Sequence, residues 1–104
     1  PTFVYAYFNR ANVRCAQKDF RAALTDYNEA IRLKPDFADA YFNRGLVYVF
    51  LGETQKGIDD LSKAGELGIV SSYNIIKRLS DWDPVWIYLK AATWKISLEI
   101  MDIT

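Results

Sequence analysis

A four-residue motif occurs twice in the chain, and this repetition constrains the fold more than any other feature. Tyr7-Phe8-Asn9-Arg10 recurs as Tyr41-Phe42-Asn43-Arg44. A fixed period of about 34 residues is typical of a repeat protein, in which each unit buries its apolar face against its neighbours. Other residues are identical at the same spacing, and these pairs are Ala6 and Ala40, Val13 and Val47, Asp26 and Asp60, Ala30 and Ala64, and Leu33 and Leu67.

Each unit is predicted to be two helices joined by a short turn, because its apolar residues recur at helical spacing. Pro35 is expected to end the second helix, since proline disfavours the helical conformation for the residue before it. Gly52 and Gly68 supply turns in which a positive φ is easily adopted. The four helices are expected at about 3–16, 20–33, 37–50 and 54–67. The side chains expected to cap helix N-termini are Asp19, Asp36, Thr54 and either Ser71 or Ser72.

The pattern is less regular after the second unit. Residues 70–80 are predicted to form a shortened first helix of a third unit, which gives a repeat region of 1–80 and a separate segment of 81–104. Asp83 and Pro84 favour a last helix that starts there and runs to about Met101. A terminal strand is the alternative, because apolar and polar residues alternate between Trp94 and Ile100, but the length of the segment favours the helix.

Composition argues against several classes of function. Acidic and basic residues balance at 13 each, whereas proteins that bind nucleic acid or anionic membranes usually carry an excess of Lys and Arg. The chain has no histidine, which is the commonest general base and metal ligand, and one cysteine, Cys15, which cannot form an internal disulfide. We therefore expect no enzyme activity, no catalytic residue, no metal and no cofactor.

Targeting signals are equally sparse. Four charged residues interrupt the most apolar stretch, from Val85 to Ile103, so no transmembrane span is predicted. No basic segment precedes an apolar one, so no signal peptide is recognised and a cytoplasmic location is favoured. The chain begins with Pro1 rather than Met, which leaves open a natural N-terminus upstream.

The units also match a known pattern. The tetratricopeptide repeat has the pattern W-x₂-L-G-x₂-Y, then A-x₃-F, then P, over a period of about 34 residues. The second unit has Tyr41-x₂-Arg44-Gly45-x₂-Tyr48, then Gly57-x₃-Leu61 and Ala64. The first has Tyr7-x₂-Arg10-Ala11-x₂-Arg14, then Ala23-x₃-Tyr27, Ala30 and Pro35. The chain therefore resembles the tetratricopeptide repeat family over residues 4 to about 69, in units of about 4–35 and 38–69. It departs from the pattern at Ile69, which replaces the closing proline, and at the arginines in the leucine position.

The resemblance implies an all-α solenoid of helical hairpins. Small residues at Ala11, Gly45, Ala23, Gly57, Ala30 and Ala64 would let the helices approach closely, and Tyr7, Tyr41, Tyr27 and Leu61 would fill the core. Arg10, Arg14 and Arg44 are expected to lay their stems along the core edge with their charged heads in solvent. The pairs Asp59-Asp60 and Asp81-Asp83 are expected to cap helices or lie on solvated helix faces.

The resemblance also implies that the first helix of each unit lines a concave groove for a peptide or an amphipathic helix. Asn9 and Asn43 either bind that partner or bridge neighbouring helices, and both alternatives stay open. Related domains that hold a peptide carboxylate use two asparagines and three cations. Asn12, Asn43 and Lys77 match three of these positions, but Phe8 and Tyr73 replace the other two cations, so a carboxylate clamp is not expected. The predicted groove residues are Tyr5, Phe8, Asn9, Asn12, Cys15, Asp39, Phe42, Asn43, Leu46, Val49, Phe50 and Lys77.

Three tryptophans in the last segment offer further contacts, because tryptophan often dominates interfaces in which it is buried. Trp82, Trp86 and Trp94 could cap the end of the solenoid, fill the groove or pair two copies of the chain. We therefore predict a non-catalytic scaffold that binds another protein or peptide. The alternatives are a homodimer assembled through this segment, and an interaction module of a longer enzyme or multidomain protein.

Overall fold

Five α-helices in hairpin order form the part of the protein that the computed structural model describes, residues 2–81. They are α1 (Thr2–Ala16), α2 (Phe20–Leu33), α3 (Ala38–Phe50), α4 (Thr54–Glu66) and α5 (Ser72–Asp81). The expected all-α architecture and the two expected hairpins are thus confirmed, and the helix bounds lie close to those predicted. The predicted helix after Pro84 and the three tryptophans lie outside the described residues.

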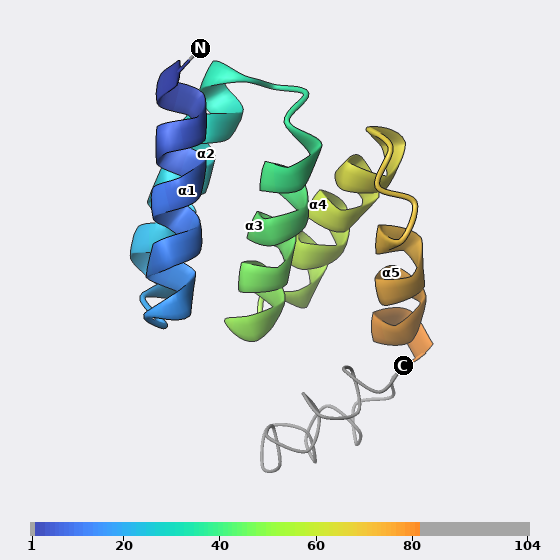
Figure 1. The fold of residues 1–104 in the computed structure, drawn as a ribbon. Coiled ribbons are helices and arrows are strands. Elements are labelled where there is room, and N and C mark those ends of the chain that lie inside the picture. Colours follow the sequence, from blue (N-terminus) through green and yellow to red (C-terminus); the bar gives the residue numbers. More distant parts are fainter. Residues whose placement is uncertain (1, 82–104) are drawn as a thin grey trace.

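The helices form two layers, with α1, α3 and α5 in one layer and α2 and α4 in the other (Figure 1). Helix α1 packs on α2, α3 packs on α4, and α2 packs on α3, so each hairpin buries its apolar face against the next. Helix α5 packs on α4 in the place that the first helix of a third hairpin would take. Within residues 2–81, no helix is long and apolar enough to cross a membrane.

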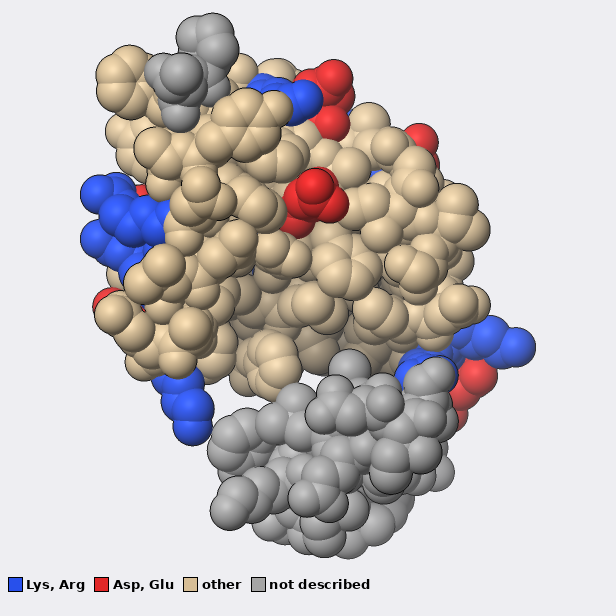
Figure 2. Space-filling model, viewed as in Figure 1, with Lys and Arg blue, Asp and Glu red and all other residues tan. Residues whose placement is uncertain are grey.

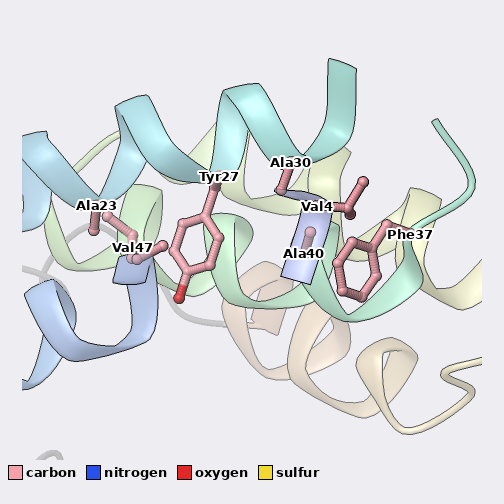
Figure 3. Packing of buried hydrophobic residues seen from close by; sticks show 8 residues of the cluster. Val4, Ala23, Tyr27, Ala30, Phe37, Ala40 and Val47 are labelled. Carbon is pink, nitrogen blue, oxygen red and sulfur yellow. The ribbon is translucent and has the colours of Figure 1, made fainter. Parts of the chain in front are cut away.

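The core lies between the two hairpins. Tyr27 points from α2 toward α3, where it lies near Val47, while Val4, Ala30, Ala40 and Phe37 pack at the other end of the cluster (Figure 3). Tyr27 and Leu61 are 1% and 0% exposed, and all six small residues expected at close helix contacts are buried. Tyr7 and Tyr41 are only half-buried, although the Tyr7 side chain packs against the core cluster as predicted. A guanidinium from the same helix, Arg10 or Arg44, lies over each ring.

The predicted glycine turns and one of the predicted helix caps are found in the structure. Gly52 and Gly68 both have positive φ, at 83° and 117°, as the turn assignments required. The carboxylate of Asp19 accepts a hydrogen bond from the backbone N–H of Ala22 and caps α2, as predicted.

The caps predicted at Asp36 and Thr54 were wrong. Helix α3 has Phe37 at its N-cap position and α4 has Glu53, and neither makes a side-chain cap hydrogen bond. Ser72 is the first residue of α5 and is fully buried. Its hydroxyl donates to the backbone carbonyls of Leu61 and Ile69, at 2.8 Å each, and so ties α5 to α4. Burial explains this choice, because a buried hydroxyl requires an acceptor.

Candidate functional site

The face formed by the first helices carries few charges. Figure 2 shows this face, over α1, α3 and α5, as mostly uncharged and hollowed toward its middle, with most Lys, Arg, Asp and Glu side chains at its margins. The side chains that sequence predicts for this face are apolar or amides, with two exceptions, Asp39 and Lys77. Such a surface suits a partner that buries apolar groups better than a strongly charged ligand.

At one end of this face, aromatic rings from α1 pack around Phe37. The Phe8 ring lies 4.7 Å from the Phe37 ring and 6.0 Å from the Tyr27 ring, and the Tyr5 ring meets Phe37 edge-on at 5.5 Å. Phe8 is half-buried, whereas Tyr5 is 53% exposed. Phe8 therefore contributes to the core as well as to the predicted groove. Sequence reasoning gave Phe37 no role beyond starting a helix, although it is 6% exposed and joins the two hairpins.

Two asparagines from different repeats, one on α1 and one on α3, are hydrogen-bonded to each other. The Asn43 Nδ2 group donates to Asn12 Oδ1 at 3.0 Å, and the Tyr27 hydroxyl donates to the same oxygen. The Cys15 sulfur lies 3.6 Å from the Tyr27 hydroxyl. Burial raises the pKa of that hydroxyl, so it stays protonated and remains a donor. Asn43 therefore bridges α1 and α3, which is one of the two alternatives that the sequence left open.

The remaining predicted groove residues are spread along the face and its edges. Phe42, Leu46 and Val49 are half-buried on α3, and Asp39 is exposed near its N-terminus. Asn9 on α1 and Lys77 on α5 are exposed and make no side-chain hydrogen bond or ion pair within residues 2–81. The Phe50 ring is 51% exposed and stacks at 5.8 Å on the ring of Phe20 from α2, so it lies between the hairpins.

Two arginine–aspartate pairs were missed by the sequence analysis. Arg10 donates from Nε and Nη2 to the two carboxylate oxygens of Asp26, at 2.8 and 2.7 Å, and Arg14 Nε lies 3.4 Å from the same carboxylate. Arg44 holds Asp60 in the same way, at 2.7 and 2.8 Å. Both aspartates are buried, at 1% and 7% exposure.

These pairs correct two expectations. Each arginine head is paired with a buried carboxylate, although the Arg10 side chain stays 54% exposed, and Asp60 does not lie on a solvated helix face. The leucine position of the repeat packs against the second helix, so an arginine there needs a buried carboxylate, and each aspartate supplies one. A signal was present in the sequence, because the arginine and the aspartate recur together, at the same separation, in both units. The three arginines are thus each paired with the aspartate of their own repeat.

The stability of the first hairpin should depend on pH through Asp26. Hydrogen bonds from Arg10 lower the pKa of the Asp26 carboxyl below its ordinary value of 3.8, and burial opposes this effect. A lowered folded-state pKa means that the unfolded chain binds more protons, so the stabilisation is complete above pH 3.8 and is lost as the pH falls through the folded value. The difference in unfolding free energy between wild type and Asp26→Asn should therefore be constant near neutrality and shrink below pH 4.

Urea unfolding at pH 7, 5, 4 and 3, followed by circular dichroism, measures this difference. Glu66→Gln removes an exposed carboxylate, whose ion pair with Lys63 at 3.9 Å is screened by solvent, and it is the matched control, for which the difference from wild type should stay small in this series. A difference for Asp26→Asn that persists unchanged to pH 3 would contradict the assignment.

Comparison with known proteins agrees with this geometry. A family model described as TPR repeat matches residues 11–52, and a second, described as tetratricopeptide repeat, matches residues 38–67. A solved structure, the crystal structure of MamA, superposes with a TM-score of 0.71 at 28% identity, over 73% of this chain and 46% of that one.

Curated relatives are similar over the same region. The chain is 34% identical over 67 residues to a UDP-N-acetylglucosamine–peptide N-acetylglucosaminyltransferase of Giardia intestinalis, covering 64% of this chain and 4% of that protein. It is 38% identical over 58 residues to the Hsp70-Hsp90 organizing protein of Triticum aestivum, covering 56% of this chain and 10% of that protein. The TPR repeat-containing thioredoxin TDX of Arabidopsis thaliana is 34% identical over 67 residues, covering 64% of this chain and 18% of that protein.

The chain spans less than a fifth of the length of each of these relatives, so the similarity concerns their repeat regions and not their other domains. The repeat itself is a non-catalytic element that generally serves in protein–protein interaction. The two matching family models together span residues 11–67, more than half of the chain, and agree with the hairpin fold. The protein belongs to the tetratricopeptide repeat family.

Proposed function

We propose that the protein is a scaffold that binds an apolar peptide or amphipathic helix of another protein on the face formed by α1, α3 and α5. The single observation that carries this proposal is the scarcity of charge on that face. Helix-in-groove recognition uses apolar anchors spaced along one face of the bound helix, and half-buried apolar side chains such as Phe42 and Leu46 fit such anchors. The exposed amide of Asn9 and the ammonium group of Lys77 supply polar contacts at the edges.

The same geometry argues against a carboxylate clamp. Asn12 Oδ1 already accepts two hydrogen bonds, from Asn43 and Tyr27, which turns these amides toward each other. Lys77 is the one cation among the five clamp positions, whereas strong carboxylate binding requires several charge-assisted hydrogen bonds. We therefore expect a bound peptide to be recognised by its side chains and not by its C-terminus.

Selection from a phage library of random 20-residue peptides against the immobilised chain, followed by calorimetry on the peptides recovered, tests the proposal. Phe42→Ala should raise the Kd of a selected peptide about tenfold, since truncating an aromatic anchor typically costs more than 1 kcal/mol. Phe3→Ala is the matched control, because Phe3 is 71% exposed but is not among the groove residues. Peptides with a free and an amidated C-terminus should bind alike.

Two results would count against this site. One is a Kd that Phe42→Ala leaves unchanged, and the other is a loss of binding on amidation of the peptide C-terminus. An unchanged Kd would show that the peptide does not bind on this face. A loss of binding on amidation would show that the protein recognises the C-terminal carboxylate of the peptide.

A second candidate function is that this scaffold serves as the partner-binding part of a longer protein. It is favoured by the small share of each relative that the chain covers, since the repeats of those proteins are parts of larger polypeptides. The complete open reading frame of the gene tests it directly. A reading frame that encodes the repeats and no other domain would exclude this candidate and leave the first intact.

A further inference from the structure

The outer face of α1 repeats the face of α3 that packs against the first hairpin. We call the α1 surface the end face, and its residues are Phe3, Ala6, Asn9, Arg10 and Val13. Their counterparts on α3 and the turn before it, each one repeat later, are Phe37, Ala40, Asn43, Arg44 and Val47. Every one of these pairs consists of the same residue type, so the two faces have the same composition and the same spacing.

On α3, this set of residues forms the interface between the two hairpins. Phe37 packs against the rings of Tyr5 and Phe8 from α1. Asn43 donates to Asn12, and Arg44 donates from Nη1 to Asn28 Oδ1 of α2 at 2.9 Å. Ala40 and Val47 are buried in the cluster around Tyr27. The same residues thus bury apolar area and satisfy polar groups across one helical interface.

On α1, the same residue types are exposed. Phe3 is 71% exposed where Phe37 is 6%, and Val13 is 56% exposed where Val47 is 3%. The Arg10 side chain is 54% exposed where that of Arg44 is 18%. Single exposed apolar residues are normal on protein surfaces, but here they form one stripe at helical spacing, which indicates an interaction surface.

Arg10 makes one hydrogen bond fewer than its counterpart Arg44 does within residues 2–81. Arg10 and Arg44 both use Nε and Nη2 to hold the aspartate of their own repeat. Arg44 also gives Nη1 to the amide of the preceding hairpin. Among residues 2–81, no acceptor is bonded to Arg10 Nη1, although Asp26 holds the guanidinium through the same two nitrogens. The end face therefore presents a positioned donor beside its apolar stripe.

We propose that the end face binds a further tetratricopeptide hairpin, packed on α1 as the first hairpin packs on α3. The occupant must offer a side-chain oxygen to Arg10 Nη1, as Asn28 does for Arg44, and aromatic rings around Phe3, as Tyr5 and Phe8 offer around Phe37.

Adding such a hairpin to the full chain tests the proposal. A duplicate of residues 1–34 placed directly before Pro1 keeps the register of the repeat and reproduces the natural Lys34–Pro35 junction. The fused protein should unfold in a single transition whose midpoint lies at least about 5 °C above that of the unfused chain, because a new interface couples the hairpins. Val13→Lys at the original position should abolish that gain, because the substitution then places a charge in an apolar interface.

The fused protein contains its own matched control. The duplicated copy of Val13 lies on the new end face, which is again uncovered, so its replacement by lysine should shift the midpoint by less than about 1 °C. The same small shift is expected for Val13→Lys in the unfused chain, where Val13 is exposed.

Three results would overturn the proposal. The first is a separate, lower-temperature transition for the duplicate, and the second is an equal effect of lysine at the two valine positions. The third is sedimentation of the unfused chain as a dimer that Val13→Lys dissociates, which would assign the end face to a second copy of this chain. Peptide binding by the α1, α3 and α5 face should be unchanged by Val13→Lys in the unfused chain, because Val13 is not a groove residue, so failure here is distinct from failure of the proposed function.

Discussion

Replacing Arg44 with methionine is expected to lower the free energy of unfolding by about 3 kcal/mol, the typical cost of removing one partner of a buried ion pair. Arg44 makes two hydrogen bonds to Asp60, one to Asn28, and lies over the rings of Tyr41 and Tyr48. Methionine retains much of the aliphatic volume but no charge. The Asp60 carboxylate, 7% exposed, would then be buried without its counter-ion. Urea unfolding at pH 7 measures the loss.

A double variant separates the charge from the packing. Arg44→Met with Asp60→Leu removes both charges, and apolar replacement of a whole buried pair is often neutral or stabilising. We expect the double variant to recover most of the loss that the single variant shows. If the two substitutions instead add, the destabilisation comes from lost packing and from the Asn28 contact, and the buried pair is not its cause.

Gly57→Ala is expected to lower the free energy of unfolding by about 2 kcal/mol, although alanine is favoured over glycine in an ordinary helix interior by about 1 kcal/mol. A Cβ atom at Gly57 would lie 2.5 Å from Val49 Cγ2 and 2.8 Å from the backbone oxygen of Gly45. The backbone oxygen cannot move without separating α3 from α4. Thermal or urea unfolding measures the change in unfolding free energy. A decrease indicates that the clash outweighs the helix preference of alanine, whereas an increase would indicate the opposite.

Gly65→Ala in the same helix is the matched control. Its Cβ would approach the end of the Tyr73 ring, at 2.5 Å, and the Ser72 hydroxyl, at 2.9 Å. Tyr73 is 46% exposed, so its ring can rotate away into solvent, and the Ser72 hydroxyl can give up one of its two carbonyl acceptors, Leu61 or Ile69. Both neighbours are side chains, so we expect Gly65→Ala to destabilise the protein less than Gly57→Ala does. Equal losses for the two variants would show that close approach of α3 and α4 is not what requires glycine at position 57.

Local preferences account for most of what could be predicted about the helices. The spacing of apolar residues and the conformational effects of Pro35, Gly52 and Gly68 act within a few residues of the chain, so they can be read from the sequence. The cap at Asp19 belongs to this class. The caps predicted at Asp36 and Thr54 were not formed, since Phe37 and Glu53 stand at those N-cap positions. At Ser72, one of the two serines considered for α5, a contact with another helix decided the arrangement, because its hydroxyl donates to the Leu61 carbonyl of α4.

For the predicted site residues, too, the sequence indicated the position on a helix, whereas the packing of the helices decided the contacts. Repeat position placed Asn12 and Asn43 on the first helices, but whether Asn43 turns to a ligand or to Asn12 depends on the distance between α1 and α3. Phe8 was predicted for the groove, and its ring also meets Phe37 across the hairpin boundary. The binding role of this face remains a prediction that the peptide experiment tests.

The sequence by itself determined the kind of molecule, because a fixed period with helical spacing in each unit leaves a stack of helical hairpins as the fold. Tertiary structure alone decided how identical residues at equivalent positions of the two repeats differ in their contacts. Arg10 and Arg44 are the same residue at the same repeat position, yet Arg44 lies beside another hairpin and Arg10 lies on an end face. The physical reason is that burial depends on what packs against a residue, and in a stack of repeats each neighbour is supplied by a different part of the chain.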